Sequence, residues 1–248
     1  PEMPDAPVNP PIFLFGGARS GTTLFIQWLA AQGEFGYGSN LISRFFKQPY
    51  FGVRVQQILT DFDKLGEFGD VKRPEIFQSD LGKTKGTLSP NEFWYFWRRF
   101  FHFKDYCELL EEDIDEELNR QFVKEMAMMD HAFGKPVALK AMIMDWHVKM
   151  LDDMFPKLLS IQLHRDPIIH MQSFLNARKA FFGNIETWYA FRPMPEFEGD
   201  WPETPYHEIA GQVYWIQRRV REAFEQIAPE RKLSVAYEDF CKDPESIY

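Results

Sequence analysis

Residues 12–30 read IFLFGGARSGTTLFIQWLA, and this stretch decides the fold. Its apolar beginning, residues 12–15, predicts a buried strand, and residues 22–32 predict a helix that ends at Gly33. A strand, a glycine-rich turn and a helix in this order are the context in which proteins bind phosphate groups. We therefore expect an anion-binding loop between the strand and the helix.

The loop departs from the Walker A pattern G-x-x-x-x-G-K-[ST] at its lysine. Gly16 and Gly21 have the required spacing and Thr23 occupies the Ser/Thr position, but Thr22 replaces the lysine and Arg19 lies inside the loop. The missing lysine would reach the β- and γ-phosphates of a nucleoside triphosphate. An arginine can instead bind an oxyanion through two N–H groups, beside the backbone N–H groups of the turn. The loop therefore favours a nucleotide with a shorter anionic tail.

Outside this stretch, apolar runs alternate with helical patterns. We expect further strands at residues 137–139, 158–163 and 233–237, irregular structure at 61–85, and helices starting at Ser89 and spanning 113–132, 145–154, 168–179 and 209–227. This alternation predicts one α/β domain, a parallel sheet flanked by helices, over residues 12–248. Residues 1–11 are rich in proline and predict a flexible leader.

Composition excludes several classes of protein. The formal net charge of −9 disfavours nucleic acid and anionic membranes as partners. The two cysteines, Cys107 and Cys241, provide neither a disulfide framework nor a metal-ligand cluster, and no apolar run is long enough to span a membrane. We therefore expect a cytoplasmic protein without a metal.

Three segments carry a resemblance to a known family. They are GGARSGTTL at 16–24, LSIQLHRDPIIHMQSF at 159–174 and LSVAYEDFCKDP at 233–244. Together they resemble the sulfotransferases that use 3′-phosphoadenosine 5′-phosphosulfate (PAPS), in particular a bacterial carbohydrate-type branch, from residue 12 to the end of the chain. Members of this family usually continue further, so the resemblance implies that the domain lacks its C-terminal end.

The resemblance implies a P-loop-like fold and a set of binding residues. The 5′-phosphosulfate loop would comprise Gly17, Ala18, Arg19, Ser20, Gly21, Thr22 and Thr23. Arg165 and Ser173, eight residues apart at the end of a strand, correspond to the 3′-phosphate site, and Tyr237 would lie near the adenine. Lys140 matches the lysine that contacts the transferring sulfonate. The acceptor would be a hydroxyl, with a glycan or a lipid-linked glycan preferred because residues 93–103 are rich in aromatic side chains.

The general base departs from the family pattern. Met142 stands where many cytosolic members have a histidine, and Leu139 stands where other branches have a glutamate. Three candidates remain, Glu92, Asp145 and His147. Glu92 also fits a capping box that begins at Ser89, Asp145 also fits a helix N-cap, and His147 also fits a packed core position. We rank Glu92 slightly above His147.

Other functions are compatible with parts of the pattern. The HRD triplet at 164–166 resembles a kinase catalytic loop, but Met171 stands where the kinase asparagine belongs. We reject that reading. An atypical P-loop phosphotransferase or NTPase, and a nucleotide-binding protein without catalysis, remain alternatives to the sulfotransferase.

Overall fold

The computed structural model describes residues 4–69, 71, 77–103, 109, 111–192 and 204–247. Cys107, Tyr248 and the first three residues of the expected leader lie outside these ranges. The remainder of the leader contacts the domain. The backbone N–H of Val8 and the side chain of Asn9 each donate to the carboxylate of Asp130 at 2.9 Å.

The centre of the domain is a five-stranded sheet in the order β2-β5-β1-β6-β7, and every adjacent pair is parallel. Its strands are β1 (Ile12–Phe15), β2 (Gly36–Tyr37), β5 (Val137–Lys140), β6 (Leu159–His164) and β7 (Lys232–Ala236). The expected α/β class with a parallel sheet is confirmed. The sequence analysis missed β2, since two residues carry no periodicity.

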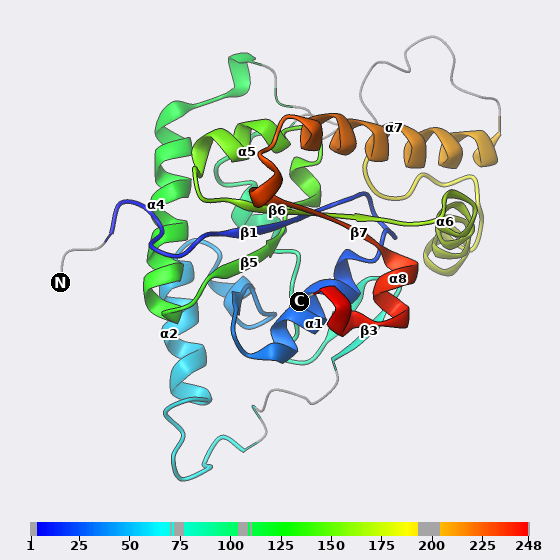
Figure 1. The fold of residues 1–248 in the computed structure, drawn as a ribbon. Helices are drawn as coiled ribbons and strands as arrows, with labels where there is room; N and C mark the ends of the chain where they lie inside the picture. The colour runs from blue at the N-terminus through cyan, green and yellow to red at the C-terminus, as the bar shows by residue number, and fades with distance from the viewer. Residues whose placement is uncertain are drawn as a thin grey trace.

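Helices cover both faces of the sheet (Figure 1). They are α1 (Thr22–Gln32), α2 (Pro49–Leu59), α3 (Trp94–Trp97), α4 (Glu116–Phe133), α5 (Val148–Met154), α6 (Pro167–Phe182), α7 (Pro205–Glu225) and α8 (Tyr237–Lys242). Short 3₁₀ turns are η1 (Ile42–Phe45), η2 (Glu111–Asp113), η3 (Met142–Met144), η5 (Pro229–Arg231) and η6 (Pro244–Ile247). A small antiparallel hairpin, β3 (Gln78–Asp80) and β4 (Lys83–Lys85), lies within the region expected to be irregular.

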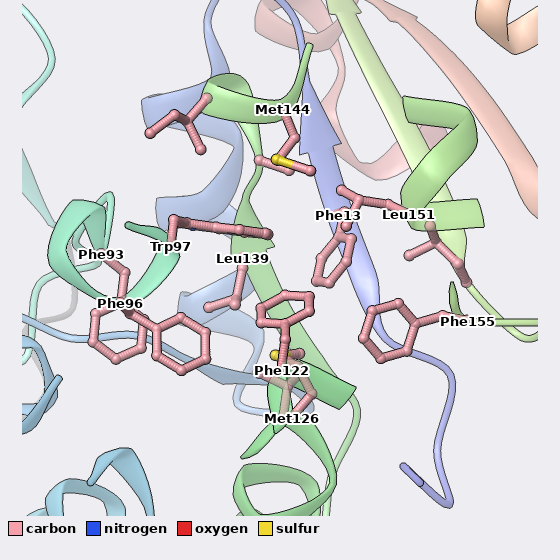
Figure 2. Packing of buried hydrophobic residues seen from close by; sticks show 14 of the residues in the cluster. Phe13, Phe93, Phe96, Trp97, Phe122, Met126, Leu139, Met144, Leu151 and Phe155 are labelled. Carbon is pink, nitrogen blue, oxygen red and sulfur yellow. The ribbon is translucent and has the colours of Figure 1, made fainter. Parts of the chain in front are cut away.

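Side chains alternate across β1 and divide the core in two. Phe13 and Phe15 point to the larger core, which α3, α4, α5 and α7 cover, whereas Ile12 and Leu14 point to the core under α1 and α8. Figure 2 shows Phe13 within the aromatic cluster of the larger core, where its ring lies 5.5 Å from that of Trp97. Burial on both faces explains why β1 is apolar at all four of its positions.

Several predicted boundaries were wrong for local reasons. The helix expected to start at Ser89 starts at Trp94, and the helix expected at 145–154 starts at Val148. The last strand ends at Ala236, because Tyr237 already opens α8. The helix expected from residue 113 begins at Glu116, because the Asp115 side chain accepts the N–H groups of Glu117 and Leu118.

The parallel strands bring three functional segments to one edge of the sheet. The loop after β1, Lys140 at the end of β5 and Arg165 after β6 all lie at carboxyl ends of neighbouring strands. Open parallel sheets bind their ligands at this edge. In the part of the chain that the structure describes, no helix is long and apolar enough to cross a membrane.

Candidate active site

The loop between β1 and α1 depends on two glycines. Gly16 and Gly21 adopt φ values of 125° and 109°, which side-chain-bearing residues rarely adopt. A Cβ on Gly16 would lie 2.3 Å from the carbonyl oxygen of Leu163, and a Cβ on Gly21 would lie 2.3 Å from the ring of Tyr237. Both glycines are therefore required for the loop to pass this close to β6 and to the Tyr237 ring.

Asp145, in the segment after the neighbouring strand β5, anchors the start of the loop. Its Oδ1 accepts the backbone N–H of Gly16 at 2.9 Å, and the residue is 2% exposed. Burial raises the pKa of this carboxyl well above its ordinary value, and the hydrogen bond from Gly16 opposes the shift only in part. The expectation that Asp145 caps a helix was wrong, since His147 occupies the N-cap position of α5. Asp145 does not line the cleft described below.

Arg19 brings the two predicted phosphate sites together. Its Nε donates to the hydroxyl of Ser173 on α6 at 3.1 Å, and its carbonyl accepts from Nη1 of Arg165 at 3.4 Å. The guanidinium of Arg165 in turn lies 4.3 Å from the ring centroid of Tyr237. Burial is the main cause that lowers the pKa of Arg19, and the neighbouring charge of Arg165 adds to it. Residues predicted from three separate segments thus lie in one connected group.

His170 supports the loop from α6, and the sequence analysis did not identify it. Its Nε2 lies 2.7 Å from the carbonyl oxygen of Ala18, and its Nδ1 lies 3.0 Å from Nε2 of Gln217. Burial lowers the pKa of this histidine to about 4. A neutral ring that donates from Nε2 and accepts at Nδ1 satisfies both neighbours. The available signal was its spacing, since His170 precedes Ser173 by three residues and so shares a helical face with it.

Three other loop residues, Thr22, Gly17 and Ser20, differ in what surrounds them. Thr22 donates its hydroxyl to the sulfur of Met142 at 3.1 Å, so the residue that replaces the family's histidine contacts the loop. A Cβ on Gly17 would lie 3.2 Å from Ile216, which indicates that the loop packs on α7. Ser20 is fully buried, and its hydroxyl has no hydrogen-bond partner among the described residues.

Glu92 and Lys140 form an ion pair beside the loop. Nζ of Lys140 donates to Oε1 of Glu92 at 2.7 Å and to the hydroxyl of Thr23 at 2.8 Å. The indole N–H of Trp94 donates to the other oxygen of Glu92. The side chain of Lys140 is 4% exposed and that of Glu92 is 30% exposed, so the lysine lies deep and the carboxylate faces the opening.

The capping box predicted for Glu92 was wrong. The N-cap position of α3 is Phe93, in a left-handed conformation without a side-chain cap, and the Ser89 hydroxyl donates to the carbonyl of Lys85 instead. Asn91 competes with the box, because its side-chain oxygen accepts the N–H of Phe93 at 2.8 Å. The Glu92 carboxylate consequently points to Lys140.

These groups line one cleft of about 610 Å³. Among the described residues its lining has five cationic side chains and one carboxylate, which are Arg19, Lys83, Arg98, Lys140, Arg165 and Glu92. A protein with a net charge of −9 thus concentrates positive charge at this edge of the sheet. The hairpin turn at Gly82 borders the cleft, where a Cβ would lie 3.3 Å from Nη1 of Arg19.

His147 does not belong to the described lining of this cleft. Its Nε2 accepts the backbone N–H of Leu109 at 3.1 Å. Among the described residues, no cluster of three or more His, Cys, Asp or Glu side chains is placed to hold a metal ion.

The family model that matches this chain is described as the sulfotransferase family, and the match covers residues 10–247. The chain therefore belongs to the sulfotransferase family, and the expected P-loop-like sulfotransferase fold is confirmed.

Solved structures of sulfotransferases share this fold with the chain at low sequence identity. Sulfotransferase STF1 from Mycobacterium tuberculosis H37Rv matches at 16% identity and a TM-score of 0.56, covering 98% of this chain and 66% of that one. Sulfotransferase STF9 from Mycobacterium avium matches at 19% identity and a TM-score of 0.53, and the match covers 98% of this chain and 62% of that one. The sulfotransferase domain from the curacin biosynthetic pathway matches at 17% identity and a TM-score of 0.50, and the match covers 98% of this chain and 72% of that one. The chain thus spans less than two thirds of the length of the two mycobacterial proteins. A search of curated proteins gives no significant match.

Replacing the buried carboxyl tests the anchoring role of Asp145. Because the pKa of Asp145 is raised in the folded state, the folded protein holds a proton that the unfolded chain releases above its ordinary pKa. Native stability is therefore lost as pH rises from about 4 towards the folded pKa. Asp145→Asn removes this loss and keeps an oxygen that can accept from Gly16. We expect the stability of the variant, relative to the wild type, to increase as pH rises.

The measurement is urea unfolding of both proteins at several values between about pH 5 and pH 8, the range in which an unfolded aspartate is ionised. A stability difference that stays constant across this range would contradict the assignment of a raised pKa to Asp145.

Proposed function

We propose that this protein transfers a sulfuryl group from PAPS to an acceptor hydroxyl. The observation that carries the proposal is the position of Arg19 in the loop: its side chain donates to Ser173, and its backbone carbonyl accepts from Arg165. PAPS needs such an arrangement, because it carries anionic groups at both its 5′ and 3′ positions. A nucleoside triphosphate has no 3′-phosphate and would leave Arg165 without a ligand.

The residues present fit this donor. The backbone N–H groups of the loop, the N-terminus of α1 and Arg19 would hold the 5′-phosphosulfate. Nε of Arg165 is buried without a hydrogen-bond partner among the described residues, and the Glu238 carboxylate lies 3.8 Å away. The N–H group at Nε is therefore available to the 3′-phosphate. The Ser173 hydroxyl accepts from Arg19 and still has its own proton to donate. Tyr237 lines the cleft beside Gly21 and Arg165, where it would lie near the adenine.

Glu92 and Lys140 would carry the transfer. The acceptor oxygen forms a bond to sulfur while the bond from sulfur to the bridging oxygen breaks, which yields a sulfate ester and adenosine 3′,5′-bisphosphate. Glu92 takes the proton of the acceptor hydroxyl. Lys140, 2.7 Å from Glu92, offers positive charge to the transferring group, and Arg19 offers it to the leaving nucleotide. The role of His147 as an alternative base stays a prediction.

Only part of the aromatic segment at 93–103 supports a glycan acceptor. Phe93, Phe96, Trp97, Phe100 and Phe101 are buried in the larger core. Trp94, however, lines the cleft together with Phe191, and the two rings are in contact with their centroids 5.1 Å apart. A glycan or lipid-linked glycan could pack against this pair of rings on its way to Glu92. Acceptor identity and the cytoplasmic location remain predictions.

Ligand stabilisation distinguishes the proposal from an atypical P-loop phosphotransferase. A ligand that binds only the folded state raises its stability by about 2.7 kcal/mol at a hundred times its Kd. We expect adenosine 3′,5′-bisphosphate to raise the melting temperature strongly and ATP with magnesium to raise it much less. Equal or greater stabilisation by ATP would refute the choice of donor. A nucleotide-binding protein without catalysis would bind the bisphosphate but would not release it from PAPS when offered a panel of hydroxyl acceptors.

Arg165→Ala tests the 3′-phosphate site. A hydrogen bond to a charged group contributes about 1.5–3 kcal/mol, so the variant should bind adenosine 3′,5′-bisphosphate roughly 10- to 100-fold more weakly. Binding of 5′-AMP, which lacks the 3′-phosphate, should hardly change. Titration calorimetry with both nucleotides provides the measurement, and an equal loss for both would assign Arg165 a structural role only.

Glu92→Gln tests the base. Glutamine keeps the shape of the side chain and can still accept from Trp94, but it cannot take the proton. We expect turnover to fall about 100- to 10,000-fold, the usual contribution of a general base, with nucleotide affinity nearly unchanged.

Glu208→Gln is the matched control. Glu208 is also 30% exposed and pairs with a buried cation, Arg178, at 2.9 Å, but it lies outside the described lining of the cleft. If both variants lose activity to the same extent, the loss reflects a broken ion pair. If Glu92→Gln keeps full activity, Glu92 is not the base and His147→Asn becomes the next test.

A further inference from the structure

Tyr189 enters the cleft from a segment that no sequence motif marked. It follows α6, lines the cleft and is followed by Ala190 with a φ of 66°. Such a left-handed conformation is uncommon outside glycine and requires support from its surroundings.

The surroundings hold this segment firmly. The side-chain amide of Gln212, a fully buried residue on α7, donates to the carbonyl oxygen of Tyr189 at 3.0 Å and also to that of Phe191. The Tyr189 ring packs beside Phe181 at 5.2 Å and Phe174 at 6.0 Å between centroids. The ring is therefore fixed by packing, and its hydroxyl is the part of the side chain left for the cleft.

Tyr189 lines the same cleft as the two ends of the proposed reaction. Its hydroxyl hydrogen-bonds with Arg19, which would hold the 5′ end of the donor, and it feels the charge of Glu92, which would take the acceptor proton. The transferring sulfonate must lie between these two points, because the acceptor oxygen attacks in line with the leaving oxygen. Burial raises the pKa of this hydroxyl, Arg19 opposes the shift and Glu92 adds to it. The phenol thus keeps its proton at neutral pH and acts as a donor.

Several other donors of the described lining already have partners. An ammonium group has three N–H donors, and Lys140 uses two of them on Glu92 and Thr23. The indole N–H of Trp94 is bonded to Glu92, and the Thr22 hydroxyl is directed to Met142. Among the described residues of the lining, Tyr189 supplies a neutral hydroxyl next to both charged partners.

We propose that the Tyr189 hydroxyl donates a hydrogen bond to the transferring sulfonate and thereby distinguishes PAPS from its product. This inference rests on the proposed function. It adds a residue that recognises the group present in the donor and absent from adenosine 3′,5′-bisphosphate.

The test compares two nucleotides on Tyr189→Phe, which removes the hydroxyl and keeps the packed ring. Affinities for PAPS and for adenosine 3′,5′-bisphosphate are measured by competition against one labelled nucleotide. We expect the variant to bind PAPS about tenfold more weakly, as for the loss of one hydrogen bond to a charged group, and to bind the bisphosphate within about twofold of the wild type. Tyr214→Phe is the control, since Tyr214 is 54% exposed on α7 and lies outside the described lining of the cleft.

The outcomes separate the two proposals. If the wild type binds neither nucleotide, the proposed function fails. If the wild type binds both and Tyr189→Phe weakens both equally or neither, the function stands and the role of Tyr189 is refuted. Thermal melting of each variant checks that the fold is kept. Tyr189→Trp, which retains an aromatic ring but moves its polar atom, should show the same selective loss of PAPS affinity.

Discussion

The hydrogen bond from Gly16 to the buried carboxyl of Asp145 is the interaction on which the active-site edge depends. It joins the segment after β1 to the segment after β5, residues that lie 129 positions apart in the chain. Gly16 is simultaneously pressed against the backbone of β6, where no side chain would fit. The direction in which the loop leaves the sheet is therefore set by both neighbouring strands. Every later contact of Arg19 with Ser173 and Arg165 requires that direction.

This loop geometry has an electrostatic cost, because it places two partly buried arginines close together. Arg19 and Arg165 lie together, and burial lowers the pKa of Arg19. His170 reduces the cost because it remains neutral, its pKa lowered to about 4, and so holds the loop without adding a third positive charge. A buried lysine at this position would place a third positive charge beside Arg19 and Arg165 and would be repelled by both. The surrounding residues thus anchor the loop through hydrogen bonds that add no positive charge.

The sequence predicted the segments of this site better than their contacts. Apolar runs that end in glycine or a charged residue identified β1, β5 and β6, and parallel pairing then required the loop, Lys140 and Arg165 to share an edge. The orientation of Glu92 could not be predicted, because the capping pattern at Ser89 competes with Asn91, whose side chain holds Phe93 in a different turn. Asp145 and His170 bond to loop residues more than 100 positions away in sequence, so the sequence could not predict their contacts with Gly16 and Ala18.

The ion pair between Glu92 and Lys140 has to satisfy two states of the cleft. Before a nucleotide binds, Lys140 is 4% exposed, and an unpaired ammonium at that depth would be costly. Glu92 and Thr23 supply its partners, and Trp94 holds the carboxylate in place. Under the proposed function, an anionic donor would bring a second negative group to the same lysine. The sulfonate would then share with Glu92 the role of balancing the charge of Lys140. The pairing that stabilises the fold without ligand is therefore compatible with the proposed transfer.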